Sequence, residues 1–222
     1  MTCFMRLSCV FRTNFLVALV KRCPVSYNII INGKTREELT MIKAMEAAER
    51  DAALKVADLM AAAARTAPKA SGKDKIITFI LTGDEKQTLA EEMRKVAAQR
   101  GEEFIERDSY NVEDSHCVVL IGAVSNPFGL SDCKMCGFEN CAEMKKAGAN
   151  CAFNITDLGI AVGSAVSVAA DHRIDNRVMY SAGAGALRMG IFPKDVRVCY
   201  GIPLYTGAKS IFFDRGAGAV LL

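Results

Sequence analysis

The chain has 222 residues, of which 51% are hydrophobic and 24% charged, and its formal net charge is +3. This balance is typical of a globular chain that buries a core, and it excludes wholesale disorder and a collagen-like architecture. The longest purely apolar runs, such as residues 15–20, are far shorter than the roughly 20 residues that a membrane helix needs. We therefore expect no membrane-spanning segment.

Charge separates the first 36 residues from the rest. Six of the 28 basic residues and none of the 25 acidic ones lie in residues 1–36, which leaves a net charge of −3 for residues 37–222. Because phosphate binding needs a clustered basic face, the sequence predicts no nucleic-acid partner. Residues 1–36 are expected to be a peripheral basic extension, with a docked strand or a targeting presequence as alternatives.

The first half of the body predicts two helices and a strand. A capping-box spacing between Thr35 and Glu38 opens a stretch rich in Ala, Met, Leu and Glu, which is predicted to run as one long helix to residue 65. Residues 75–83 form a β-branched run that ends in glycine. Residues 84–100 have amphipathic spacing, and Gly101 closes this second helix.

The second half predicts more strands and two helices rich in small residues. Strands are predicted at residues 103–108, 116–122, 196–204 and 210–215. Helices are predicted at 157–171 and 176–189, the second capped by Asp175 and stopped by Gly190. Since no internal repeat or linker interrupts this pattern, residues 37–222 are predicted to form a single α+β domain.

The chain has nine cysteines, an odd number, and they are unevenly placed. Four of them fall in the segment 131–152. A disulfide framework would spread an even set of cysteines through a small secreted chain. A metal site in a reducing cytoplasm fits this distribution better, so we expect a cytoplasmic protein.

The four clustered cysteines, Cys133, Cys136, Cys141 and Cys151, form a C-x2-C-x4-C-x9-C array. The two-residue spacing lets two sulfurs reach one centre from a tight turn, and Gly137 permits the positive φ that turns backbone N–H groups toward bound sulfurs. Zinc ribbons usually oppose two C-x2-C turns, and this array has only one. The spacing favours a [4Fe-4S] cluster over structural zinc or thiols that bind nothing. Such a cluster would transfer electrons or staple the loop.

The remaining candidate residues are expected to be structural. Cys117 and Cys199 lie in apolar runs, where free cysteine commonly acts as a small buried hydrophobe. His116 and His172 have no metal-ligand spacing to each other. The glycines in 183–190 lie inside a helical pattern and do not match the dinucleotide-binding fingerprint, so we expect them to permit close helix packing.

Several separate motifs resemble a prokaryotic family of unknown function described as containing a ferredoxin domain. These motifs are AAARTAPKASGKD, DSHCVVLIG, CKMCGFENC, DLGIAVGSAV, DNRVMY and GIPLYTGAKSIFFDR, and the resemblance covers roughly 180 residues from about Met41 onward. The resemblance implies an iron–sulfur protein of microbial metabolism. It does not supply a reaction.

The order of the predicted elements also resembles the flavin-dependent nitroreductase fold. That resemblance implies an α+β protein with a mixed sheet flanked by helices, here with the cysteine-rich segment as an iron–sulfur loop insertion. It also implies a homodimer with FMN at its interface, and Arg65 and Lys69 as flavin-binding residues. The R-x-S-x-R start that such enzymes often use for the FMN phosphate is replaced by MIKAMEAAER. Arg65 and Lys69 can alternatively be solvated cations at a helix C-terminus.

Three functional hypotheses follow. The first is an iron–sulfur oxidoreductase in which the cluster feeds electrons to FMN and FMN reduces a small substrate. The second is a non-enzymatic electron carrier or redox sensor that needs only the four cysteines. Both require a redox partner protein. The third is an interaction protein stapled by zinc. We also expect self-association through the long first helix and the helices rich in small residues.

Overall fold

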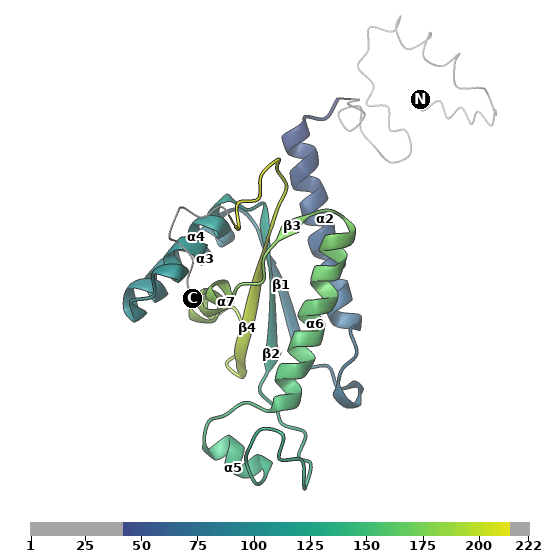
Figure 1. Ribbon diagram of the computed structural model, residues 1–222, viewed down its shortest axis with the longest axis vertical. Coiled ribbons are helices and arrows are strands. Elements are labelled where there is room, and N and C mark those ends of the chain that lie inside the picture. Colours follow the sequence, from purple (N-terminus) through teal and green to yellow (C-terminus); the bar gives the residue numbers. More distant parts are fainter. Residues whose placement is uncertain (1–41, 214–222) are drawn as a thin grey trace, which may run out of the picture. The chain divides into compact units, whose positions relative to one another are not determined.

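The computed structural model describes residues 42–213, which from Met45 onward form one compact unit (Figure 1). The expected extension 1–36 and the helix cap at Thr35 lie outside the described residues. In chain order the elements are α2 (Met45–Thr66), η2 (Ala70–Gly72), β1 (Ile76–Leu81), α3 (Gly83–Arg100), α4 (Glu103–Asp114), β2 (Cys117–Val124), α5 (Cys141–Lys146), α6 (Ala152–Asp171), β3 (Asp175–Asn176), α7 (Tyr180–Met189) and β4 (Val196–Tyr205).

The strands form one four-stranded sheet in the order β1-β2-β4-β3. All three strand pairs are antiparallel, in place of the mixed sheet that was expected. The α+β class predicted from the sequence is confirmed. β2 pairs with β1 on one side and β4 on the other, so it is the strand that organises both faces.

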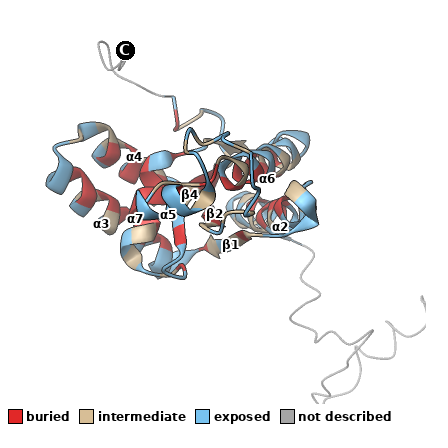
Figure 2. Cartoon of the chain, turned by 90° about the horizontal axis from the view of Figure 1, so that it is seen from below, coloured by how far each residue is buried: buried red, intermediate tan, exposed pale blue. Residues whose placement is uncertain are grey.

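Helices cover both faces of this sheet (Figure 1). Alternate β2 side chains, including Cys117, Val119 and Ile121, belong to the core shared with α2 and α6. Val118 and Leu120 belong to the second core, which they share with α3, α4 and α7. Because both faces are covered, β2 is apolar throughout, as a buried strand should be. Figure 2 shows the buried residues gathered where the helices meet the sheet.

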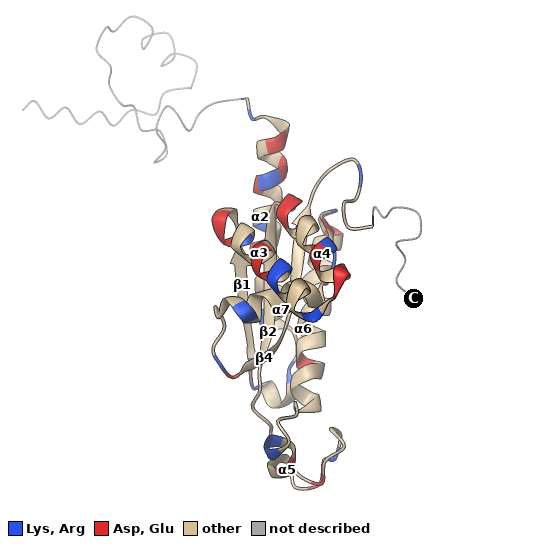
Figure 3. Cartoon of the chain, turned by 90° about the vertical axis from the view of Figure 1, so that its left-hand side faces the viewer, with Lys and Arg blue, Asp and Glu red and all other residues tan. Residues whose placement is uncertain are grey.

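α6 is exceptional among the described helices because its length and hydropathy suffice to cross a membrane. Its core-facing side packs against α2 and the sheet, where Leu158, Ala161 and Ala165 are buried. This packing accounts for the apolar residues on the core-facing side. Figure 3 shows how few charges it carries.

The outer side of α6 is also apolar, since Ile155 and Ile160 are exposed there. A Cβ added at Gly159 or Gly163 would meet no atom within 4 Å. α2 exposes Leu59 as well. This uncovered surface supports the predicted self-association, which stays a prediction that light scattering can test.

One predicted strand is a helix. Residues 103–108 were expected to be extended, yet α4 covers Glu103–Asp114. Its buried residues Ile105, Asp108, Ser109 and Val112 have helical spacing. The expectation was wrong because six residues are too short a window to distinguish the period of a strand, about 2 residues, from that of a helix, about 3.6 residues.

Two further expectations near the C-terminus are wrong. Asp175 does not cap α7, because Asp175 and Asn176 pair with β4 as the short strand β3, and Met179 precedes α7 instead. The strand expected at 210–215 is absent from its described part, residues 210–213. Long-range hydrogen bonds hold this part, such as the one that Asn111 Nδ2 donates to Ile211 O at 2.9 Å.

The glycines of α7 permit close packing, as predicted. A Cβ on Gly183 would lie 1.8 Å from the carbonyl oxygen of Cys199 in β4. At Gly185 a Cβ would lie 2.6 Å from Cγ of Met93 in α3. The absence of side chains at these positions lets α7 lie directly on the sheet and on α3.

We predict that Gly183→Ala destabilises the fold by about 3 kcal/mol or more, because a backbone carbonyl blocks the new methyl group. The control is Gly163→Ala, on a helix surface where the methyl group meets nothing. It should stabilise α6 by about 0.5 to 1 kcal/mol through helix propensity. Urea unfolding of both variants, at one protein concentration, measures the difference. Equal stabilities would contradict the close packing of α7 on β4.

Candidate metal centre

The predicted ligand cysteines lie in the long connection between two buried elements. β2 ends at Val124 and α6 begins at Ala152, so residues 125–151 form a loop that contains only the short helix α5. In Figure 1 this loop and α5 lie together beyond one end of the sheet. We call residues 125–151 the cysteine loop.

Cys133 and Cys136 lie on one tight turn. The N–H of Gly137 donates to the carbonyl of Lys134 at 2.9 Å. Lys134 and Gly137 both have positive φ, of 51° and 82°. The left-handed conformation expected at Gly137 is therefore present, and it brings the two cysteines around the same turn.

Cys141 and Cys151 each lie at the start of a helix. Cys141 is the first residue of α5, and the side chain of Asn140 caps this helix by accepting from the N–H groups of Ala142 and Glu143, both at 3.0 Å. Cys151 is the residue that precedes α6, a helix of 20 residues. The positive end of the α6 dipole lies there, and it favours a negatively charged thiolate or cluster.

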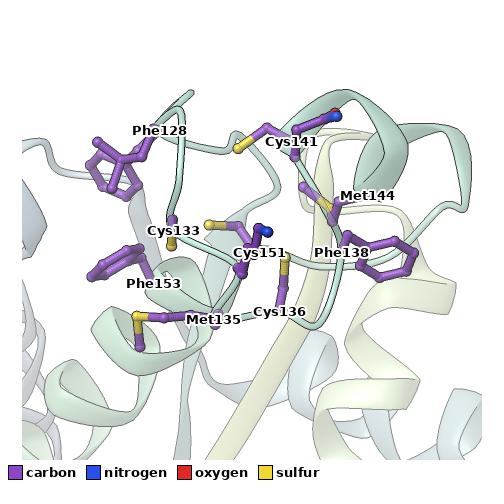
Figure 4. A pocket seen from close by; sticks show the side chains of 13 residues that line it. Phe128, Cys133, Met135, Cys136, Phe138, Cys141, Met144, Cys151 and Phe153 are labelled. Atoms are coloured by element: carbon purple, nitrogen blue, oxygen red, sulfur yellow. The ribbon is translucent and has the colours of Figure 1, made fainter.

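All four cysteines line one cavity. Figure 4 shows their side chains around a common space. Most of the other lining side chains are apolar, among them Phe128, Leu130, Met135, Phe138, Met144 and Phe153. The arrangement combines four soft sulfur donors with mostly apolar walls.

Four clustered thiols are the donor set of an iron–sulfur cluster and also that of a structural zinc site. Within residues 42–213, no three His, Cys, Asp or Glu side chains converge closely enough for a single metal ion. Four thiolates around one zinc ion would have to meet at about 2.3 Å from the metal. In a [4Fe-4S] cluster each thiolate instead binds a different iron, so the sulfurs surround a larger body. That these four residues are the ligands stays a prediction.

Asn154 closes the base of the cysteine loop. It is buried in the first turn of α6, and its Nδ2 donates to the carbonyl of Val124 at 3.0 Å. The Lys75 amino group lies 3.4 Å from Asn154 Oδ1, and it donates to the carbonyl of Asn126. These contacts join the end of β2 to the start of α6, so the two ends of the loop are held together.

The same lysine contributes a charge beside the cavity. Lys75 Nζ lies 3.6 Å from the ring centroid of Phe128, and this ring packs edge-on against Phe153. Burial lowers the pKa of Lys75, while the nearby Cys151 and Asp157 act to raise it. A cation here would offset part of the negative charge of four thiolates and a cluster.

The predicted flavin-binding residues lie at the C-terminal end of α2. Lys69 Nζ donates to the carbonyls of Ala64, Arg65 and Ala67, at 2.8 to 2.9 Å. Arg65 forms an ion pair with Asp74. All three N–H donors of the lysine are thus occupied by carbonyl groups at a helix end. Contact of either residue with a flavin stays a prediction.

Cys117 and Cys199 are core residues, as expected. Both are buried, in β2 and β4. Burial raises the pKa of each thiol to about 12. These thiols therefore stay protonated near neutral pH, and they are poor ligands and poor nucleophiles.

The cysteine spacing does not point to Asn154, Lys75 or Phe128. Only Asn154 had a visible signal, because it is a polar residue three positions after Cys151. The other two become significant only when β1 and the cysteine loop are brought together.

We predict that Asn154→Ala weakens the hold on the loop. Loss of this buried hydrogen bond leaves the carbonyl of Val124 with only the N–H of Asn126 as a donor, at 3.0 Å, and should cost about 0.5 to 1.5 kcal/mol. Iron should then be lost faster to a chelator. Asn111→Ala is the matched control, since it removes a similar amide-to-carbonyl bond, to Ile211. Equal rates of iron loss in the two variants would contradict the role of Asn154.

We also predict two classes of thiol in the cluster-free protein. Iodoacetamide at pH 8 should label Cys133, Cys136 and Cys141, which are partly exposed, and it should spare Cys117 and Cys199 until the protein is unfolded. Because the pKa of the two core thiols is raised to about 12, labelling at pH 9 should still spare them. Mass spectrometry of the labelled peptides reads out each site. Rapid labelling of Cys199 in the folded protein would contradict this assignment.

Solved structures with similar folds are nitroreductase-like proteins at low sequence identity. A nitroreductase with bound FMN from Desulfitobacterium hafniense is 13% identical, with a TM-score of 0.49, over 70% of this chain and 79% of that one. A putative NADH dehydrogenase/NAD(P)H nitroreductase from Bacteroides thetaiotaomicron is 10% identical, with a TM-score of 0.47, over 70% of this chain and 75% of that one.

A sequence relative and a family model give the closer relationship. A protein of Archaeoglobus fulgidus described as "Uncharacterized protein" is 42% identical over 165 residues, which are 71% of this chain and 88% of the relative. Residues 147–215 match a family model described as "Uncharacterized protein containing a ferredoxin domain (DUF2148)". Of the four clustered cysteines, this match includes only Cys151. The chain belongs to this ferredoxin-domain family.

Proposed function

We propose that the protein is a redox protein that holds one [4Fe-4S] cluster on Cys133, Cys136, Cys141 and Cys151. The observation that carries the proposal is that all four thiols line a single cavity with mostly apolar walls. When bound, the cluster supplies one-electron transfer at a potential set by its surroundings. Membership of a ferredoxin-domain family supports the same conclusion.

The protein's own residues would hold and shield the cluster. The turn at Lys134–Gly137 and the starts of α5 and α6 present the four sulfurs. Phe128 and Phe153 separate them from solvent on one side, and the positive end of α6 and Lys75 offset negative charge. The low dielectric of apolar walls makes these charges more effective than in water.

A partner protein that exchanges electrons would dock on the cysteine loop. Leu130 and Met135 line the cavity, and both are exposed at its rim. Exposed apolar side chains beside a redox centre favour a transient protein contact. We place this exchange in the cytoplasm, where four free thiols and the core thiols remain reduced.

A flavin-dependent oxidoreductase is the second candidate. One observation favours it: Asp157 is buried, its Oδ1 accepts from the N–H of Ala70 at 2.9 Å, and its Oδ2 has no hydrogen-bond partner among the described residues. This orphan oxygen lies beside the segment that carries Lys69, with Arg65 exposed nearby. A bound ring with N–H donors would satisfy Oδ2.

Anaerobic purification with iron, sulfide and flavin analysis tests the proposal. We expect four irons and four sulfides per chain and a broad absorption that bleaches reversibly on one-electron reduction. Cys136→Ser should lose the iron, the sulfide and the absorption. Cys199→Ala is the control and should keep its iron. Stoichiometric zinc, or iron content unchanged in Cys136→Ser, would contradict the proposal.

The same sample separates the two candidates. Flavin bands above the broad absorption, lost in Asp157→Asn with iron retained, would support the oxidoreductase. Broad absorption alone would leave an electron carrier or redox sensor. The flavin content therefore decides between enzyme and carrier without affecting the cluster proposal.

A further inference from the structure

A second hollow lies on the opposite face of the sheet from α6, between α3, α7 and the first half of β4. Its volume is about 430 Å³, within the range of roughly 300 to 1,000 Å³ that is usual for small-molecule sites. Ten residues line it: the polar ones are Gln99, Arg100, Tyr180, Arg188 and Arg197, and the other five are uncharged and mostly apolar. Three of the lining residues are cationic and none is acidic.

The three guanidinium groups keep donors available. Arg188 Nε donates to Glu92 at 2.8 Å and its Nη1 to Gln99 at 3.0 Å. Arg100 Nη1 donates to the hydroxyl of Tyr180 at 2.6 Å. Each guanidinium has five N–H groups, so these bonds leave several unused. The Tyr180 hydroxyl accepts from Arg100, which leaves its own proton free to be donated.

The charges around the hollow do not cancel. Arg188 is paired with Glu92, and the nearest Glu102 oxygen is 3.9 Å from Arg100. Arg197 donates to two carbonyl oxygens, those of Gly148 and Ala149, and forms no ion pair among the described residues. Three cations therefore face two carboxylates, and neither carboxylate lines the hollow.

We propose that this hollow binds a small organic oxyanion, one compound per chain. Its carboxylate or phosphate group would be bound by Arg100, Arg197 and the Tyr180 hydroxyl, since guanidinium groups match the geometry of both oxyanions. Its apolar body would lie against the other side of the lining, where Ala184 and Cys199 are found. A purely inorganic anion would leave that surface uncovered.

Arg197 connects this site with the cysteine loop. The carbonyls that it binds belong to Gly148 and Ala149, which come shortly before Cys151. Arg197 therefore contacts both the hollow and the part of the cysteine loop that directly precedes Cys151, a predicted cluster ligand. The anion site stands on its own lining, and it does not depend on the cluster.

Calorimetric titration of the full-length protein at low ionic strength tests the proposal. The probes are phenyl phosphate, benzoate, inorganic phosphate and the neutral benzyl alcohol. We expect phenyl phosphate or benzoate to bind at one site per chain, and inorganic phosphate and benzyl alcohol to bind at least tenfold more weakly. Comparison of the two affinities shows whether the site prefers a phosphate or a carboxylate group. No saturable binding of either, or equal binding of benzyl alcohol, would overturn the proposal.

Variants locate the binding site. Arg100→Gln and Arg197→Gln should each weaken binding at least tenfold, and Ala184→Leu should do so by filling the hollow while keeping every charge. Arg50→Gln, an exposed position on α2, is the matched control and should bind normally. If circular dichroism shows that Arg197→Gln is unfolded, the affinities of Arg100→Gln and Ala184→Leu decide whether the hollow is the binding site. Unchanged affinity in these two variants would overturn the assignment.

Discussion

The hydrogen bond from Asn154 to the carbonyl of Val124 joins the two ends of the cysteine loop, on which all four predicted ligand cysteines lie. Val124 ends the most buried strand of the sheet, and Asn154 lies in the first turn of a helix packed on that strand. Both ends of the loop are thus fixed by the core. Because few regular elements lie between them, we expect the order of the loop to depend on these ends and on the predicted cluster.

The two faces of the sheet carry different candidate sites. α2 and α6 bury one face and deliver Cys151 at the start of α6, beside Lys75. α3, α4 and α7 bury the other face and leave a hollow lined by three arginines. The glycines of α7 let this helix pack directly against the backbone of β4. Arg197, from the start of β4, contacts the cysteine loop, so the two candidate sites share one structural connection.

Local patterns predicted most of the fold, and long-range contacts account for what was missed. The cysteine spacing, Gly137 and Gly101 are local signals, and the turn and helix end that they indicate are present. Residues 103–108 were wrong because a short window hides the helical period that continues to Asp114. The hollow on the second face joins residues from α3, α7 and β4. No sequence spacing reveals such a set, since the fold alone brings its members together.

The most direct test of the central claim is a crystal structure of anaerobically purified protein with anomalous data at the iron edge. The account predicts four iron peaks in the cavity lined by the cysteines, each about 2.3 Å from one of the sulfurs of Cys133, Cys136, Cys141 and Cys151. A single peak at the zinc edge shared by the four sulfurs would contradict it. So would a disulfide between any two of these cysteines in protein that retains its iron.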